Sequence, residues 1–176
     1  MKLPLTRFNN YLLCLLVVLL ASGCASSETR KKKKEASTLR LYLEADAGST
    51  RGTAVPVYRA SPMLLNVERT PFLDEGYLAN ASVVDVVGGF AIQVRYEYHG
   101  TLVLEGVTAS NNGKRIAVYS QFPGGRWLAA PKITSRIANG TFTFTPDATR
   151  EEADRIVNGL NNVAEELGNK PKSKSK

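Results

Sequence analysis

Few residues in this chain are of the types that perform nucleophilic, acid–base or metal chemistry. The sequence contains one histidine, His99, and two cysteines, Cys14 and Cys24. Zinc sites are built from several nitrogen and sulfur ligands, so one histidine without cysteine partners does not predict a metal site. No Gly-x-Ser-x-Gly turn is available to expose a nucleophilic serine. We therefore predict that the protein is not an enzyme, has no catalytic residue, cofactor or metal ion, and carries His99 on its surface.

One pair of neighbouring residues has the composition of a binding site. Arg126 and Trp127 lie shortly before Pro131, and arginine and tryptophan are enriched among the residues that dominate interface energies. An exposed Trp127 beside a hairpin would contact an extended peptide, and we predict Arg126 and Trp127 as this contact. The alternative is that Trp127 fills the core between a sheet and a helix. An open sheet edge is a second means of binding an extended chain.

Cys24 follows the features of an export signal. Two basic residues precede an apolar run at 11–20, and small residues follow it, as in a secretory signal peptide over residues 1–23. The run is too short to cross a bilayer, which takes roughly 20 residues. Ala21-Ser22-Gly23-Cys24 resembles a bacterial lipobox, although the usual leucine is displaced by one place to Leu20. The resemblance implies lipidation of Cys24, and the alternative is an ordinary signal peptide with an incidental cysteine.

The lipobox resemblance also implies a location. Acyl chains stabilise membrane attachment by roughly 0.8 kcal/mol per buried methylene, so two or three chains anchor a protein firmly. The residue after Cys24 is Ala25, whereas an aspartate there favours retention in the inner membrane of bacteria. We therefore expect a lipid-anchored protein of the cell envelope, on the outer membrane and facing the periplasm.

The net charge of +7 arises at the two ends of the chain. Residues 36–169 carry 12 basic and 14 acidic side chains, whereas residues 30–34 and the segment after Gly168 are rich in lysine. Runs of like charge repel and stay disordered, so we expect a charged tether over 24–37 and a disordered basic tail over 169–176. Alternatively, the basic residues of the tether contact anionic lipid head groups, and each positive charge then contributes about 1 kcal/mol to membrane binding. A folded part without a basic surplus argues against nucleic acid as a partner.

Residues 38–168 are predicted to fold as one α+β domain. Gly88-Gly89 between two β-rich runs predicts a hairpin over 82–98. Thr149 and Glu152 form a capping box that begins a helix, which Gly168 ends. Gly159 within that helix indicates either close packing on the sheet or a tolerated glycine. The composition of 101–107 favours a strand, although its apolar residues also fit one helical face. Other strands are expected at 39–43, 63–68, 115–122, 126–130 and 141–145, with a broken strand from residue 55 and a connection with a helical turn over 70–79.

The stretch 114–162 resembles a known family. The motifs that carry the resemblance are Leu128-Ala129-Ala130-Pro131-Lys132-Ile133, Phe144-Thr145 and Glu151-Glu152-Ala153. Their order is similar to that in the head of the first periplasmic domain of SecD, from the SecDF protein-export family. The similarity extends back through the Gly88-Gly89 hairpin to residues 71–73. These motifs are turns and caps, so they specify a fold more closely than a function.

The resemblance implies a mainly antiparallel sheet with two helices packed on one face, one of them over 100–112. It also implies contact with unfolded exported polypeptide. SecD couples export to the proton gradient through membrane-spanning helices, and no stretch after Cys24 is long enough for one, so that role does not follow. We predict a non-catalytic lipoprotein that binds unfolded or extended polypeptide as an accessory to the export machinery. The alternative is a structural or assembly lipoprotein that docks on a folded envelope partner.

Overall fold

The computed structural model describes residues 35–46, 48–122 and 124–169. The predicted signal peptide, Cys24 and the basic residues 170–176 lie outside this range. Within it, no helix combines the length and the apolar composition that a bilayer span requires. The described chain forms strands, helices and one 3-10 turn in this order: β1 (Thr38–Leu43), β2 (Gly52–Val57), β3 (Met63–Glu68), η2 (Glu75–Tyr77), β4 (Leu78–Val86), β5 (Gly89–Tyr96), α2 (Tyr98–Ser110), β6 (Ile116–Gln121), β7 (Gly125–Ala129), β8 (Thr141–Phe144) and α3 (Arg150–Glu166).

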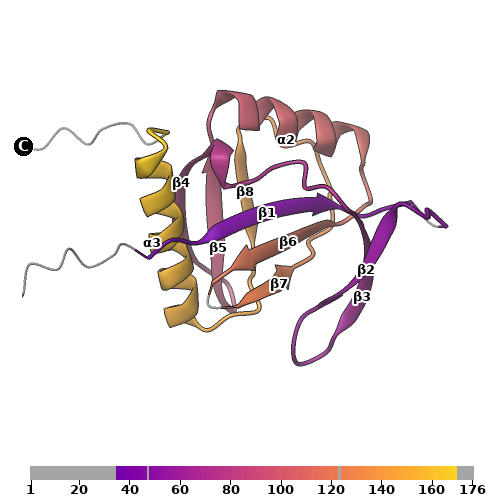
Figure 1. Ribbon diagram of the computed structural model, residues 1–176, viewed down its shortest axis with the longest axis horizontal. Helices are drawn as coiled ribbons and strands as arrows, with labels where there is room; N and C mark the ends of the chain where they lie inside the picture. The colour runs from indigo at the N-terminus through magenta and orange to yellow at the C-terminus, as the bar shows by residue number, and fades with distance from the viewer. Residues whose placement is uncertain (1–34, 47, 123, 170–176) are drawn as a thin grey trace, which may run out of the picture. The chain divides into compact units, whose positions relative to one another are not determined.

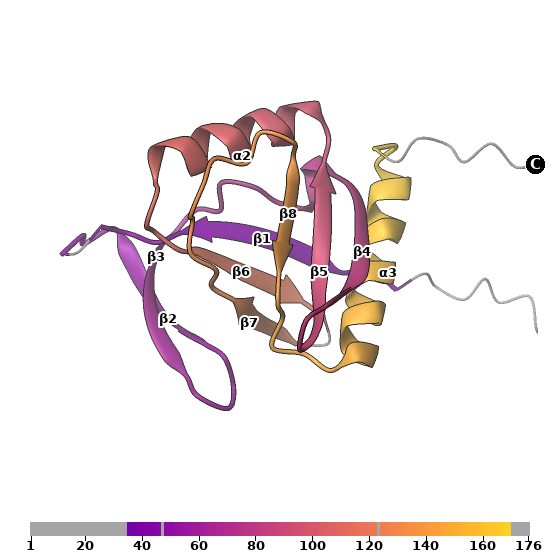
Figure 2. The ribbon, with the colours of Figure 1, turned by 180° about the vertical axis from the view of Figure 1, so that it is seen from behind.

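The strands pair in three antiparallel sheets (Figure 1). The β6 sheet has the order β1-β6-β7, the β5 sheet has the order β4-β5-β8, and β2 and β3 form a separate hairpin. Figures 1 and 2 show the strands of the β6 sheet running across those of the β5 sheet, with α3 beside β4. The α+β class, the antiparallel pairing and the two helices are confirmed. The strands divide into small sheets because two twisted sheets can cover each other's apolar faces.

The main core lies between the two three-stranded sheets and both helices. On β1, Leu39, Leu41 and Leu43 are buried and alternate with more exposed residues, which confirms the predicted strand. Phe142 and Phe144 of β8 enter the same core. Burying one such side chain fully contributes roughly 1.5–3 kcal/mol, so these alternating residues determine which face of each strand turns inward.

The segment whose composition favours a strand is a helix. α2 begins at Tyr98, and the preceding Glu97 caps it by accepting hydrogen bonds from the amides of His99 and Gly100. The strand before it accordingly ends at Tyr96 rather than Tyr98. The resemblance to SecD therefore predicts this element correctly and the local composition does not. Leu104 is fully buried in the main core, so tertiary packing selects the helix.

The C-terminal helix agrees with its sequence pattern. The Thr149 side chain accepts a hydrogen bond from the Glu152 amide, and the Glu152 carboxylate accepts one from the Thr149 amide. Gly168 follows the helix with φ of +77°. Gly159 lies against Ser37, where an added Cβ would be 2.3 Å from the serine hydroxyl. Close packing is therefore the reason for this glycine, and its neighbour is the residue that precedes β1.

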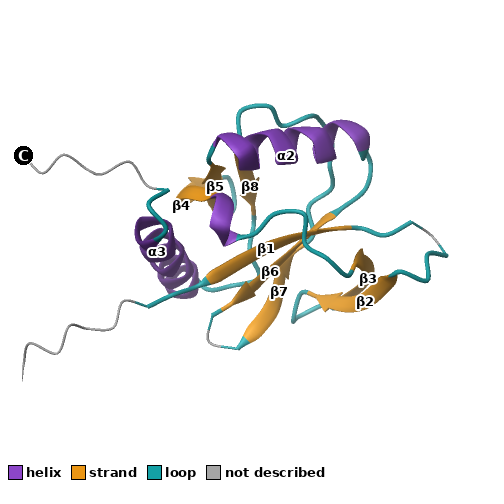
Figure 3. Ribbon diagram, turned by 45° about the horizontal axis from the view of Figure 1, so that its top comes forward, coloured by secondary structure: helices purple, strands orange, loops and turns teal. Residues whose placement is uncertain are grey.

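A second, smaller core lies beneath the β2–β3 hairpin. Val55 and Val57 of β2 pack with Leu65 and Val67 of β3 against the β6 sheet. Figure 3 shows the hairpin standing beside that sheet, away from both helices. Packing of these inward side chains therefore holds the hairpin against the β6 sheet.

Candidate functional site

Arg126, predicted to contact peptide, is engaged within the domain. Its guanidinium donates to the Glu152 carboxylate at 2.7 Å and to the main-chain carbonyl of Asp147 at 3.4 Å. The side chain is 24% exposed. Arg126 thus links β7 to the first turn of α3, and little of its charge is free for a ligand.

Trp127 lies half-buried in an aromatic group beside the β2–β3 hairpin. Its ring makes edge contacts with Tyr42 and Tyr119 at centroid distances of 5.0 and 5.2 Å. It packs against the second core, which holds Val55 and Val57. The structure thus gives Trp127 a packing role, and its contact with peptide stays a prediction.

His99 lies at the surface, as predicted. Its side chain is 78% exposed, and its Nδ1 is 3.6 Å from the Glu97 carboxylate. Among the described residues, no cluster of histidine, cysteine, aspartate and glutamate could hold a metal ion.

α2 lies along the outside of the domain, with one side turned away from the sheets (Figure 3). At 3.6 residues per turn, its exposed residues share one side of the helix. Tyr98 is 71% exposed, Leu102 48% and Val103 36%. We call this surface the α2 face; its exposed residues are Tyr98, His99, Leu102, Val103, Gly106, Ala109 and Ser110.

The α2 face carries no acidic residue, lysine or arginine. Glu105 is the helix's single acidic residue, and it turns aside to an ion pair with Arg136. Surface helices ordinarily place charged residues on their solvent side. α3 does so, since its exposed residues include Glu151, Asp154 and Arg155. Contiguous exposed apolar surface is one of the features found at interaction sites.

Sequence reasoning did not select the α2 face. A helix that is apolar on its inner side and uncharged on its outer side lacks the 3.6-residue alternation that identifies surface helices. The available signal was the charge pattern, because Glu105 is the single charged residue between Glu97 and Lys114. This scarcity of charged residues makes the composition of the segment similar to that of a strand. Because the segment is a helix, it also leaves the exposed side of that helix without acidic residues, lysine or arginine.

A pocket of about 480 Å³ lies at the N-terminal end of α2. Tyr98 and Thr101 belong both to α2 and to the pocket wall, so the pocket is continuous with the α2 face. The other lining residues come from the ends of β4 and β5 and from the loop before β8: Ala79, Asn80, Arg95, Tyr96, Glu97 and Asn139. The side-chain amides of Asn80 and Asn139, which are exposed, are suited to hydrogen-bonding a polypeptide main chain.

Glu97 is held as a carboxylate in this pocket. Burial raises the pKa of the Glu97 carboxyl, but the hydrogen bonds from the amides of His99 and Gly100 outweigh that effect and lower the pKa below its usual value. The two amides lie 3.0 and 2.8 Å from its oxygens. Glu97 therefore serves as a helix cap.

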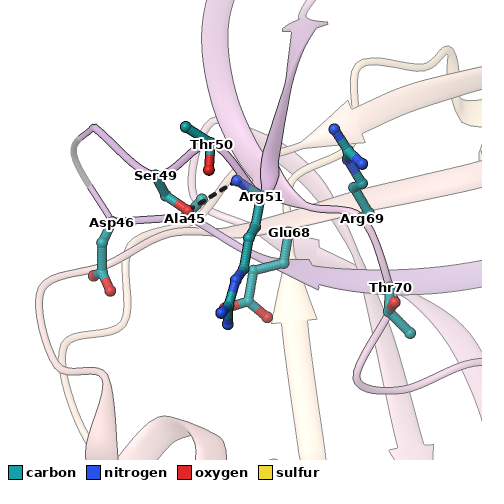
Figure 4. A pocket seen from close by; sticks show the side chains of 8 residues that line it. All are labelled: Ala45, Asp46, Ser49, Thr50, Arg51, Glu68, Arg69 and Thr70. Atoms are coloured by element: carbon teal, nitrogen blue, oxygen red, sulfur yellow. Dashed lines mark hydrogen bonds between the residues drawn. The ribbon is translucent and has the colours of Figure 1, made fainter.

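A second pocket, of about 460 Å³, lies where the chain enters and leaves the β2–β3 hairpin (Figure 4). Charges of both signs line it, including Arg51 and Arg69 beside Glu68. The Arg51 amide donates to the Ser49 hydroxyl at 3.2 Å. Because the charges are mixed, this pocket has no clear preference for one class of ligand.

The sequence matches no protein-family model and no curated protein. Two solved structures are similar in fold. One is a membrane component SecDF that enhances protein export, with a TM-score of 0.53 and 20% identity over 73% of this chain and 63% of that one. The other is SecDF in a super-membrane-facing form, with a TM-score of 0.55 and 19% identity over 73% of this chain and 19% of that one.

These similarities confirm the fold predicted from the SecD resemblance. The chain spans less than two thirds of the length of either SecDF structure. At these identities the similarity concerns the arrangement of helices and strands, and function has to be argued from the residues of this chain.

Proposed function

We propose that this chain is a non-catalytic lipoprotein of the bacterial cell envelope that binds unfolded or extended polypeptide as an accessory to protein export. The uncharged α2 face is the observation that carries the proposal. The fold adds support, because one neighbour of similar fold is a SecDF component that enhances protein export.

The α2 face suits an unfolded partner for a physical reason. Unfolded chains expose the leucine, valine and aromatic side chains that folded proteins bury. Leu102 and Val103 offer them apolar contact, and Tyr98 adds an aromatic ring at the mouth of the pocket. Without a charged side chain on this face, binding would depend little on the client's sequence. The adjoining amides of Asn80 and Asn139 can meet its main chain.

In this proposal Cys24 carries the lipid that holds the domain on the outer membrane, facing the periplasm. The apolar run and the small residues before Cys24 support this part. Mass spectrometry of the mature protein isolated from membranes tests it. Acyl chains on an N-terminal Cys24 are expected, and an unmodified Cys24 would remove the anchor from the proposal.

A binding assay with a matched pair of variants tests the polypeptide function. The full-length chain in detergent is titrated with a fluorescent protein that has been reduced and carboxymethylated, so that it stays unfolded. Leu102→Glu places a charge on the α2 face and should weaken binding by about tenfold. Asn158→Glu places the same charge on the exposed side of α3, and its binding should equal that of the original chain.

The native form of the same fluorescent protein provides the second comparison. Binding of the unfolded form alone supports the proposed function. Equal binding of both forms, or unchanged binding by Leu102→Glu, contradicts it. A preference for one folded envelope protein would instead support the structural or assembly role.

A further inference from the structure

The edges of the sheets differ in how their main-chain groups are satisfied. An edge strand presents unpaired N–H and C=O groups that can recruit another chain, and proteins usually cover such edges. On β1, the Leu41 amide donates to the Leu73 carbonyl at 2.8 Å, and the Leu41 carbonyl accepts from the Phe72 amide at 2.9 Å. On β7, the Leu128 carbonyl accepts from the Asp147 amide at 2.7 Å. Both outer edges of the β6 sheet are therefore engaged.

The β4 edge of the β5 sheet is covered at Ala81 by a side chain. The Ala81 amide donates to the Asn161 side-chain oxygen at 3.0 Å, and the Asn161 nitrogen donates to the Ala81 carbonyl at 2.9 Å. Asn161 belongs to α3, which packs along β4. Its carboxamide thus occupies the place that a neighbouring strand would take at Ala81, whereas by the two-residue alternation the main-chain groups of Val83 and Asp85 also face outward.

The β2 edge is protected by a proline. The Asn66 carbonyl accepts from the Ala45 amide, so Asn66 of β3 turns its main chain away from β2. The main-chain groups of its partner Ala54 therefore point away from β3, toward the open side of β2. By the two-residue alternation, the main chain of Pro56 points to the same side. Proline has no N–H to donate there, which makes this edge a poor template for a further strand.

β8 is the other edge of the β5 sheet. The Tyr96 amide donates to the Gly140 carbonyl. By the two-residue alternation, the main chains of Phe142 and Phe144 hydrogen-bond to β5. The N–H and C=O of Thr143, between them, therefore point away from β5. Thr143 is exposed. The Thr141 amide is already satisfied by the Asn139 side chain at 3.0 Å. β8 forms the edge of the β5 sheet opposite β4 (Figure 2), and the outward main-chain groups of this edge are centred on Thr143.

We infer that an extended polypeptide segment adds to the β5 sheet as a further strand at β8, through hydrogen bonds to the main chain of Thr143. The inference rests on the proposed function for the nature of the occupant. Asn139, which immediately precedes Gly140 and β8, also lines the pocket at the end of α2. A strand along β8 would therefore lead into the surface already assigned to polypeptide.

The side chains around this edge specify the chemistry of the segment. Phe142 and Phe144 face the core, so every second residue of the added strand should be apolar. On the solvent side Thr143 pairs with Gln93 and Thr141 pairs with Arg95, and Arg95 has no ion-pair partner among the described residues. The fitting segment alternates apolar with uncharged polar residues and carries an acidic residue opposite Thr141, on the same face of the sheet as Arg95.

A proline substitution tests the strand addition directly. The probe is a fluorescent, end-blocked peptide of alternating valine and threonine that ends in glutamate, titrated into the full-length chain in detergent. Thr143→Pro removes the outward N–H and leaves the β5–β8 hydrogen bonds in place, so binding should weaken by about tenfold. Thr143→Val keeps the N–H and should change binding by less than about twofold. Ala54→Pro makes the same change on the β2 edge and should bind as the original chain does.

Amide hydrogen exchange of the unmodified chain gives a readout that does not depend on a variant's folding. The Thr143 amide should gain protection when the peptide is added, and unchanged exchange at Thr143 in the bound state overturns the inference. Thr143→Pro binding as tightly as Thr143→Val also overturns it. If Leu102→Glu still weakens binding of the unfolded protein in that case, the proposed function stands and only the strand addition fails.

Discussion

Replacing Gly159 with alanine tests how closely α3 approaches the start of β1. Alanine is favoured over glycine inside a helix by about 1 kcal/mol. At residue 159, however, the added Cβ would lie 2.3 Å from the Ser37 hydroxyl and 2.8 Å from the Ser37 main-chain nitrogen. A main-chain atom cannot rotate away, and overpacking of a core costs typically about 1–3 kcal/mol. We expect Gly159→Ala to lower the free energy of unfolding by about 1 kcal/mol.

Gly106→Ala is the matched control. Gly106 also lies inside a helix, but an added Cβ there meets no atom within 4 Å. The helix propensity then acts alone, and the free energy of unfolding should rise by about 1 kcal/mol. Urea unfolding followed by circular dichroism measures both variants, and the opposite signs make the comparison independent of the denaturant extrapolation.

Ser37→Gly provides the decisive combination. It removes the serine hydroxyl, which is the atom nearest the added Cβ, and leaves the main-chain nitrogen at 2.8 Å, so Gly159→Ala should cost less in the Ser37→Gly background. A coupling free energy near zero in this double-mutant cycle would refute the reasoning. So would a Gly159→Ala variant that is stabilised as much as Gly106→Ala, because Gly159 would then be a tolerated glycine.

Three further perturbations follow from individual contacts. Asn161→Leu removes both hydrogen bonds to Ala81, and it should lower the free energy of unfolding by about 1–3 kcal/mol and speed hydrogen exchange at Ala81. Trp127→Ala leaves a cavity beneath the β2–β3 hairpin and should cost about 3 kcal/mol in urea unfolding. Glu152 has a lowered pKa because Arg126 and the Thr149 amide bond its carboxylate. Its folded pKa is below its unfolded pKa, so the stability it contributes is present above about pH 4.3 and is lost as the pH falls through the folded pKa. Glu152→Gln should reduce this acid-dependent loss in urea unfolding measured across that range.

The sequence alone predicted the elements whose signals are local. The alternation of Leu39, Leu41 and Leu43, the turn at Gly88-Gly89 and the capping box of Thr149 each involve residues only a few places apart. Their geometry depends on φ and on short-range hydrogen bonds, which the nearby sequence determines. The exposure of His99 was predictable for a similar reason, because it lies at the end of the predicted strand.

The identity of α2 and its uncharged face were decided by the tertiary structure. The composition of 101–107 is compatible with a strand or a helix, and burial of Leu104 among residues distant in sequence selects the helix. Charge spacing indicated a segment poor in charged residues, but only the fold shows that Tyr98, Leu102 and Val103 face outward. The side of a helix that is covered depends on its neighbours, which local residues do not specify.

The sequence alone also did not predict how accessible Trp127 and the sheet edges are. Trp127 packs with Tyr42, 85 places earlier in the chain, and Asn161 covers an edge at Ala81, 80 places away. The amino-acid sequence determined where strands and helices begin and end wherever the signal is local. Which strand edges and side chains remain open depends on contacts between distant segments, because these form only when the whole domain packs.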